Sequence, residues 1–302
     1  MRLKGWRGSL LLAVGFGFVY VGVRSAPLPQ CELAHYHDDL NKQGEINYCG
    51  DEETIFFDLN RLKYPVTAQI SPVGSIRKGE TTDFTLELKT LSGKPVTPQD
   101  IVVSHTERIH LMAVDRSLDE YHHIHPQPIG NTGKWTFSMR PGKGGPYQFY
   151  LDFITLHGVR RTLLHTSVKV PGDAQEPRLK TAKHTTTATG VEFEFVPVNT
   201  TANTLIAGEQ YRLALRAKEQ EEIKLQKVMG SFAHVAAFLP QRTGFAHLHP
   251  RTPVNPQQKT HPPEMQFSFT PQNEGTYRFW AQIKYNGKEH YLPFNFKVKA
   301  DT

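Results

Sequence analysis

The sequence contains one histidine pattern twice, and this repeat constrains the fold more than any other feature. The stretches Tyr121–Pro126 and Phe245–Pro250 each place two histidines at i and i+2 and end in proline. A third histidine lies 13 residues before the first member of each pair. The two triads superimpose at a single offset of 124 residues: His110, His123 and His125 on His234, His247 and His249. A chain with such a repeat is predicted to be a duplicated module.

Further matches give the boundaries of the two copies. Gly208-Glu209 corresponds to Gly79-Glu80, and Gly275–Trp280 corresponds to Gly145–Tyr150 at an offset of 130, so six residues are inserted before the later match. A length of 302 residues suits two domains of ordinary size. We predict five segments: a signal peptide or membrane anchor at 1–25, a cysteine-containing lead-in at 26–65, a first domain at 66–170, a linker at 171–187 and a second domain at 188–302.

The hydrophobic pattern within each copy is typical of strands. Phe84–Lys89 alternates apolar and polar residues, and Tyr147–Phe153 is rich in aromatic residues. Turn residues separate such stretches, as in Pro141–Pro146. Glu219–Val228 has helical composition, but a turn occupies its place in the first copy. The sequence therefore predicts an all-β chain with two tandem Ig-like β-sandwich domains after an N-terminal signal or anchor segment.

The N-terminus resembles a secretory signal. Met1–Gly8 carries three basic residues, and Ser9–Val23 is apolar. This apolar run of 15 residues is shorter than the roughly 20 residues of a membrane span. A cleaved signal and an uncleaved anchor both remain open, and both place the domains outside the cytoplasm, since the basic flank stays inside. We expect a periplasmic or secreted protein, or one anchored in the inner membrane through this segment alone.

The net charge argues against nucleic acid as a partner, and the cysteine content suggests a disulfide bond. Removing residues 1–25 removes four basic residues and no acidic ones, so the net charge falls from +6 to +2. This balance gives no reason to expect nucleic acid binding. The two cysteines, Cys31 and Cys49, follow the signal segment directly. In an oxidising compartment they are predicted to form a disulfide bond.

The histidine pairs are predicted to lie on hairpins. Residues i and i+2 of a strand point to the same face, so His123 and His125 project together while Ile124 points into the core. If the hairpin closes around Ser117-Leu118, four facing pairs follow: His110 with His125, Met112 with His123, His234 with His249 and Ala236 with His247. Directly opposed Cβ atoms lie roughly 4.5–5.5 Å apart, so each hairpin would gather its histidines into one patch.

Imidazole nitrogens suit copper, zinc and nickel, and a thioether adds a preference for Cu(I). We therefore predict metal ligands at seven positions, with copper as the expected ion and zinc as the alternative: His110, Met112, His123, His125, His234, His247 and His249. A structural role remains open, because histidines that shape a corner of the fold would also be duplicated. A small-ligand or pH-sensing role remains open as well.

Two polar positions on a later strand could support the ligands. Tyr150 and Asp152 share a strand face, and Trp280 and Gln282 are their counterparts. A carboxylate at this place could orient a ligating imidazole. We expect instead that this face is solvated.

The sequence does not indicate an enzyme. It contains no Gly-x-Ser-x-Gly, His-Glu-x-x-His, phosphate-loop or Gly-x-Gly-x-x-Gly motif, and neither copy contains a cysteine for a blue-copper site. We predict an extracytoplasmic metal-binding or delivery protein, with a membrane or periplasmic metalloprotein as its partner. The alternative is a metal-free adhesion or scaffolding protein whose histidines are structural.

The first copy resembles a known group of domains. Its sequence around His110–Asp115, Tyr121–Pro126 and Gly144–Phe153 is similar to bacterial extracytoplasmic β-sandwich domains of the YtkA-like and FixH-like kind. The resemblance spans about residues 66–170 and again 188–299. It implies an Ig-like sandwich and a role in copper or other heavy-metal handling, with the six motif histidines carried over. The lead-in with Cys31 and Cys49 has no place in that pattern.

Overall fold

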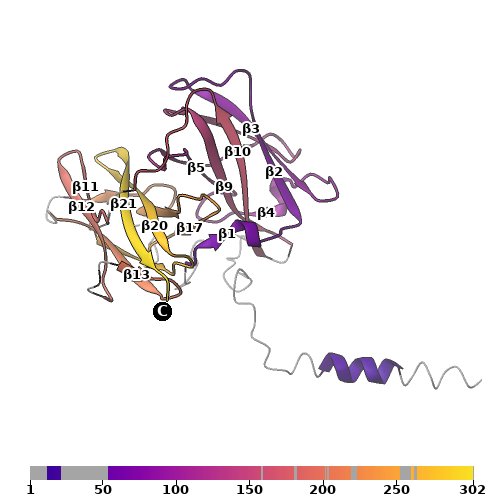
Figure 1. The fold of residues 1–302 in the computed structure, drawn as a ribbon. Helices are drawn as coiled ribbons and strands as arrows, with labels where there is room; N and C mark the ends of the chain where they lie inside the picture. Colours follow the sequence, from indigo (N-terminus) through magenta and orange to yellow (C-terminus); the bar gives the residue numbers. More distant parts are fainter. Residues whose placement is uncertain are drawn as a thin grey trace, which may run out of the picture. The chain divides into compact units, whose positions relative to one another are not determined.

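The computed structural model describes residues 12–21, 54–157, 159–179, 182–200, 202, 204–218, 223–251, 260–261 and 264–301. The chain divides into two compact units, residues 1–35 and 36–302. In the first unit, residues 12–21 form a helix (Figure 1). Among the residues with a described structure, none belongs to a helix with the length and hydropathy of a membrane span. The predicted Cys31–Cys49 disulfide lies outside the described residues.

The first sandwich alternates buried and exposed residues as its sequence predicts. In β3, Phe84, Leu86 and Leu88 are buried while the residues between them are partly exposed. One sheet has the order β10-β9-β5-β6, with β4 also on β9, and the other has the order β2-β3-β8-β7. The strands are β2 (Val66–Pro72), β3 (Thr82–Thr90), β4 (Ile101–Val102), β5 (His110–Val114), β6 (Tyr121–Ile124), β7 (Gln127–Pro128), β8 (Lys134–Met139), β9 (Gly145–Thr155) and β10 (Arg160–Val170).

The second sandwich repeats this plan. Its smaller sheet has the order β11-β12-β14-β19. Its larger sheet contains the path β1-β17-β16-β20, in which β1 is Phe57–Asp58, with β21 on the other side of β20. The chain is thus all-β with two tandem sandwiches, as predicted. The strands are β11 (Thr185–Ala188), β12 (Val191–Pro197), β13 (Thr204–Ile206), β14 (Tyr211–Ala217), β15 (Leu225–Gln226), β16 (Ala233–Phe238), β17 (Gly244–Leu248), β18 (Thr260–His261), β19 (Glu264–Phe269), β20 (Gly275–Tyr285) and β21 (Lys288–Lys299).

A strand from the lead-in belongs to the second sandwich, although it precedes the first in sequence. This strand, β1 (Phe57–Asp58), pairs antiparallel with β17. Ile55 forms a bridge to Thr270, and Phe56 is buried in the hydrophobic core of the second sandwich. Residues 55–58 therefore pack on the second sandwich, although the first sandwich follows them directly in the sequence.

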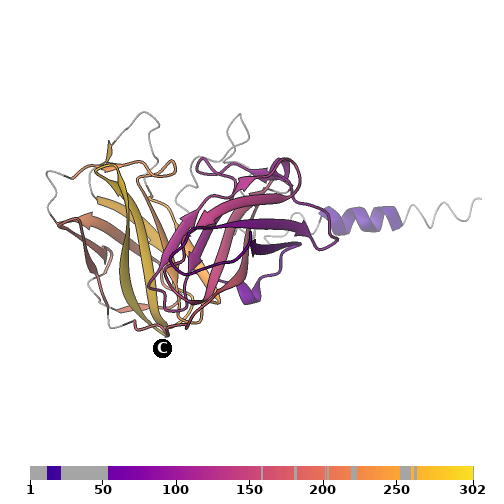
Figure 2. The same cartoon turned by 90° about the horizontal axis from the view of Figure 1, so that it is seen from above.

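The two sandwiches lie side by side (Figures 1 and 2), with a third apolar cluster in addition to their own cores. We call this cluster the interface cluster: Leu59, Met112, Val114, Leu118, Tyr121, Tyr150, Leu163, Ala236, Phe238, Phe245 and Trp280. Its residues come mainly from β5, β6 and β9 of the first sandwich and from β16, β17 and β20 of the second. The outer faces of these two sheets are therefore buried against each other.

Hydrogen bonds across the interface occur in matching pairs. The Tyr150 hydroxyl donates to the carbonyl oxygen of Arg242 at 2.8 Å, and the Trp280 indole N–H donates to the carbonyl oxygen of Leu118 at 3.2 Å. Tyr150 corresponds to Trp280 in the repeat, and Leu118 to Arg242. Leu118 and Arg242 both have left-handed backbones, with φ of 60° and 55°. The two sandwiches thus contact each other with approximate two-fold symmetry.

Candidate metal centre

Both hairpins have the register predicted from the sequence. In the β5–β6 hairpin, Met112 lies opposite His123. In the β16–β17 hairpin, Ala236 lies opposite His247. Because side chains alternate along a strand, Leu248 points into the core of its sandwich and the neighbouring histidines point outward. The histidines that point outward from one sandwich face the other sandwich.

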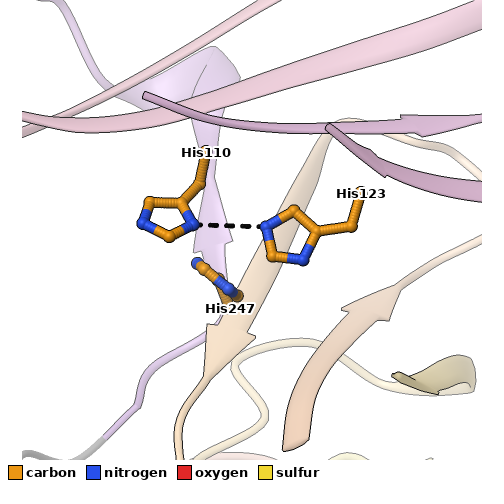
Figure 3. A group of neighbouring side chains, drawn as sticks. All are labelled: His110, His123 and His247. Atoms are coloured by element: carbon orange, nitrogen blue, oxygen red, sulfur yellow. Dashed lines mark hydrogen bonds between the residues drawn. The ribbon is translucent and has the colours of Figure 1, made fainter. Parts of the chain in front are cut away.

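The six histidines therefore converge in one place at the interface. The His247 ring centroid lies 5.1 Å from that of His110 and 5.2 Å from that of His123. These three rings point toward one another, two from the first sandwich and one from the second (Figure 3). Among the described residues, two groups bring their ligand atoms within 4.8 Å of one another: His110, His123 and His247, and His234, His247 and His249.

These groups agree only in part with the triads predicted from the sequence. The second group is the predicted triad of the second copy. In the first group, His247 of the second sandwich takes the place expected for His125. His125 is nevertheless close, because its Nε2 lies 3.2 Å from Nδ1 of His110. The sequence predicted two separate patches, whereas the structure brings both patches together.

Backbone carbonyls hold the first histidine of each copy. Nε2 of His110 lies 3.1 Å from the carbonyl oxygen of Ser104, and Nε2 of His234 lies 3.1 Å from that of Val228. A carbonyl only accepts, so Nε2 carries the hydrogen in both rings. The other ring nitrogen, Nδ1, then has a lone pair that faces the cluster.

The second histidine of each copy is held by the opposite sandwich. Nδ1 of His247 lies 3.1 Å from Oδ2 of Asp152, and Nδ1 of His123 lies 2.9 Å from Oε1 of Gln282. Asp152 and Gln282 are 6% and 0% exposed, so the expectation of a solvated face was wrong. The neighbouring sandwich covers this face, and the alternative role, orienting an imidazole, is the one observed. In the sequence, the one sign of this shared role is that Asp152 and Gln282 correspond to each other in the repeat, at an offset of 130.

Asp152 also pairs with Arg161 of β10. The guanidinium donates to both carboxylate oxygens, at 2.9 and 2.6 Å. Burial alone would raise the pKa of Asp152, but the charge of Arg161 and the hydrogen bonds from His247 and Arg161 hold it well below its ordinary value. The carboxylate is therefore ionised, and it accepts the hydrogen of His247.

Two residues near the third histidines were missed by the sequence reasoning. Oε1 of Glu107 lies 3.4 Å from Nδ1 of His125, and the ring of His105 stacks on His249 with 3.9 Å between centroids. Both residues lie in the turn between β4 and β5, where Ser104 pairs with Glu107. The turn places His105 at a φ of 50°, an uncommon backbone for a residue other than glycine.

The ring nitrogens that point into the cluster carry no hydrogen, so they cannot hydrogen bond to one another. Nδ1 of His110 lies 3.2 Å from Nε2 of His123, yet the hydrogen of each neutral ring is on its outer nitrogen. Two lone pairs at this distance cannot hydrogen bond, whereas a shared cation would satisfy both. Nitrogens that bind one tetrahedral Zn²⁺ at about 2.0–2.1 Å lie about 3.3–3.4 Å apart. The observed separation therefore fits ligation of one ion.

The second copy presents the same kind of atom. Three buried ring nitrogens there have no hydrogen-bond partner among the described residues: Nδ1 of His234, Nε2 of His247 and Nε2 of His249. Buried polar atoms are normally satisfied, because desolvation of an unpaired group is costly. Their convergence in one place indicates a cation site.

The buried rings are neutral. Burial, and then the neighbouring imidazoles, hold the pKa of His110, His123, His234 and His249 well below the ordinary value. Burial, and then the neighbouring His247, lowers the pKa of His125 to about 4. Neutral imidazoles have lone pairs available for a metal at pH 7.

Met112 lies on the same strand face as the histidines but packs among apolar side chains. It is fully buried within the interface cluster, where Tyr150 is its cross-strand neighbour on β9. Its position in the second copy is taken by Ala236, which is also buried in this cluster. Met112 thus has the predicted register and face, and it contributes to the apolar packing of the interface.

Fold and site together define a two-domain β-sandwich protein with a histidine cluster buried between its domains. The chain belongs to the family described as Domain of unknown function (DUF8832), whose model matches residues 63–171 and again residues 189–300. The two matched segments fit the tandem arrangement of the sandwiches. No curated protein matches the chain.

Proposed function

We propose that the protein binds transition metal in the histidine cluster, with copper as the preferred metal and zinc as the alternative. The observation that carries the proposal is the convergence of ring nitrogens with lone pairs. Nδ1 of His110 and Nε2 of His123 lie 3.2 Å apart, and neither carries a hydrogen. A cation between them removes the repulsion and supplies the missing partner.

The donor set supports a transition metal over calcium or magnesium. All six inner ligands are imidazoles, which suit copper, zinc and nickel, whereas calcium and magnesium prefer oxygen ligands. The carbonyl and side-chain acceptors behind the rings fix their orientation, as acceptors behind metal-binding histidines commonly do. Copper is placed first because Met112 adds a thioether to the same strand face, and thioethers favour Cu(I).

Binding or delivery suits this site better than catalysis. His110, His123, His234 and His247 are at most 6% exposed, so a substrate has little access to an ion held there. Structural metal sites are closed, whereas catalytic sites keep a position open. We place the protein outside the cytoplasm, in the periplasm or secreted or held at the inner membrane, and infer that it serves a membrane or periplasmic metalloprotein. The similarity to YtkA-like and FixH-like domains stays a prediction.

Calorimetric titration with copper and zinc tests the proposal. The full chain is first treated with a chelator and then titrated. We expect binding tighter than micromolar, and a double variant in each copy tests the assignment: His123→Ala with His125→Ala, and His247→Ala with His249→Ala. His165→Ala is the matched control, because His165 is an exposed histidine on β10.

The outcomes decide whether the histidines are metal ligands or structural residues. Weakened binding in both double variants, with wild-type binding in the control, supports a metal site in the cluster. A wild-type chain that binds neither metal below micromolar concentration contradicts the proposal. In that case the histidines serve as structural corners of a metal-free scaffolding or adhesion protein.

A further inference from the structure

We propose that the cluster is a dinuclear centre that binds two Cu(I) ions, one for each histidine triad. The inference rests on the proposed function and specifies the number, the charge and the position of the ions. The first ion would be bound by His110, His123 and His125, and the second by His234, His247 and His249.

The number of donors exceeds the needs of one ion. Six ring nitrogens converge on the site, whereas a tetrahedral ion takes four ligands. Nδ1 of His110 lies 3.2 Å from Nε2 of His123 and 3.2 Å from Nε2 of His125, so an ion at Nδ1 of His110 has both other rings of its triad beside it. The ligand atoms of His234, His247 and His249 lie within 4.8 Å of one another and suit a second.

The symmetry of the surroundings supports two equivalent positions. Ser104 and Val228 hold the first histidine of each triad by the same bond at the same distance. Asp152 and Gln282, which also correspond in the repeat, hold the second histidine of the opposite triad. The first two histidines of each triad are therefore oriented by acceptors at corresponding positions of the repeat.

The two positions must lie close together. His247 belongs to both groups of ligand atoms that lie within 4.8 Å of one another, one with His110 and His123 and one with the rest of its own triad. Its Nδ1 is bound to Asp152, so only Nε2 can bind metal, and one nitrogen does not serve two ions. A pair of ions separated by about 3.5–4 Å, as in known two-metal sites, fits these contacts.

The charge of the site selects monovalent ions. Imidazole binds a metal as a neutral ligand, and two carboxylates contact the cluster, those of Asp152 and Glu107. The charge of Asp152 is offset by Arg161. Two dications repel about four times as strongly as two monocations at the same separation, because the interaction scales with the product of the charges. Two Cu(I) ions therefore fit better than two Zn²⁺ or two Cu²⁺ ions.

An anaerobic titration with Cu(I) tests the inference. The full chain competes with a chromophoric Cu(I) chelator, and we expect two equivalents of copper per chain, against one equivalent in a parallel titration with Zn²⁺. His125→Ala and His249→Ala change the more exposed histidine of each triad, and each variant should retain one equivalent. The control His165→Ala should retain two.

A measurement on the wild-type chain avoids dependence on variants that fold poorly. X-ray absorption at the copper edge, after loading with two equivalents, should show a copper–copper distance below about 4 Å with imidazole ligands. One equivalent in the wild type, or loss of all copper in either single variant, overturns the dinuclear centre while the proposed function stands. A wild-type chain that binds no metal overturns the proposed function and this inference with it.

Discussion

Oδ2 of Asp152, in the first sandwich, lies 3.1 Å from Nδ1 of His247, in the second. The two residues come from different copies of the repeat, and the corresponding contact joins Gln282 to His123 at 2.9 Å. Each sandwich thus orients a histidine of the other. The histidine cluster is complete only when both sandwiches are packed together.

We expect Asp152→Asn to weaken both metal binding and folding. Acceptors behind ligating histidines typically contribute 10–100-fold in metal affinity, so we expect a loss of roughly that size. The change also removes the charge of a largely buried ion pair with Arg161, whose side chain is 14% exposed, and this should lower the free energy of unfolding by about 3 kcal/mol. Titration calorimetry and urea denaturation measure the two effects.

The exposed Asp173→Asn provides the matched control, because it makes the same chemical change away from the cluster. Its affinity and stability should equal those of the wild type. Wild-type metal affinity in Asp152→Asn would show that this carboxylate does not orient His247.

The symmetric interface yields a second prediction, on Tyr150→Phe. The change removes the hydroxyl that donates to the carbonyl of Arg242 at 2.8 Å and leaves the ring in place. Losing the partner of this partly buried carbonyl should lower the free energy of unfolding by about 1 kcal/mol. Metal stoichiometry should not change, because Tyr150 belongs to the interface cluster and its ring packs against Phe238 and Phe245, away from the six histidines.

Thermal and urea denaturation of the chelator-treated chain measure this effect. Tyr285→Phe is the control, because its ring is only partly buried and lies away from the interface cluster. Equal stabilities of the two variants would show that the interface bond contributes nothing to folding.

Local features of the site could be predicted from the sequence. The register of both hairpins follows from strand alternation and from the short connection around Leu118, so the pairing of Met112 with His123 was correct. The repeat itself, at an offset of 124, gave the all-β tandem organisation. These features depend on residues close together in the chain.

Contacts between the domains could not be predicted in the same way. Tyr150 and Asp152 alternate with core residues of β9, and an alternating strand has the same sequence whether its other face meets water or a second sandwich. The role of Asp152 depends on this choice, as does the exchange of His247 for His125 in the first ligand group. Pairing of β1 with β17 likewise joins segments nearly two hundred residues apart.

Acidic solution should destabilise the metal-free chain. Burial, and then the nearby His247, lowers the pKa of His105 and His125 to about 4 in the folded chain, whereas free histidine titrates near 6.5. Below pH 6.5 the unfolded chain therefore binds more protons than the folded chain. The free energy of unfolding should fall as the pH decreases from 6.5 to about 4, by about 1.4 kcal/mol per pH unit for each such ring.

Urea denaturation of the chelator-treated chain between pH 7 and pH 4.5 measures this dependence. His105→Ala should reduce the slope, because it removes one of the rings. His157→Ala, at an exposed position, should leave the slope unchanged. A free energy of unfolding that is constant over this range would mean that the rings remain accessible to protons in the folded chain.

The last prediction concerns Gly244, where β17 meets β1. A methyl group at this position would overlap the carbonyl oxygen of Phe57, a backbone atom that cannot rotate away. Gly244→Ala should therefore displace β1 and withdraw Phe56, which is 1% exposed, from the core of the second sandwich. The free energy of unfolding should fall toward that of Phe56→Ala, for which about 3–5 kcal/mol is expected.

Limited proteolysis and denaturation together test this displacement. In Gly244→Ala, cleavage should appear around residues 54–62 before the sandwiches are digested, because a released strand is accessible to protease. Thr243→Ala is the control: it changes the adjacent residue, keeps the backbone carbonyl that accepts from Leu59 and adds no atom toward Phe57. If Gly244→Ala resists protease as well as this control does, β1 is not held by its pairing with β17.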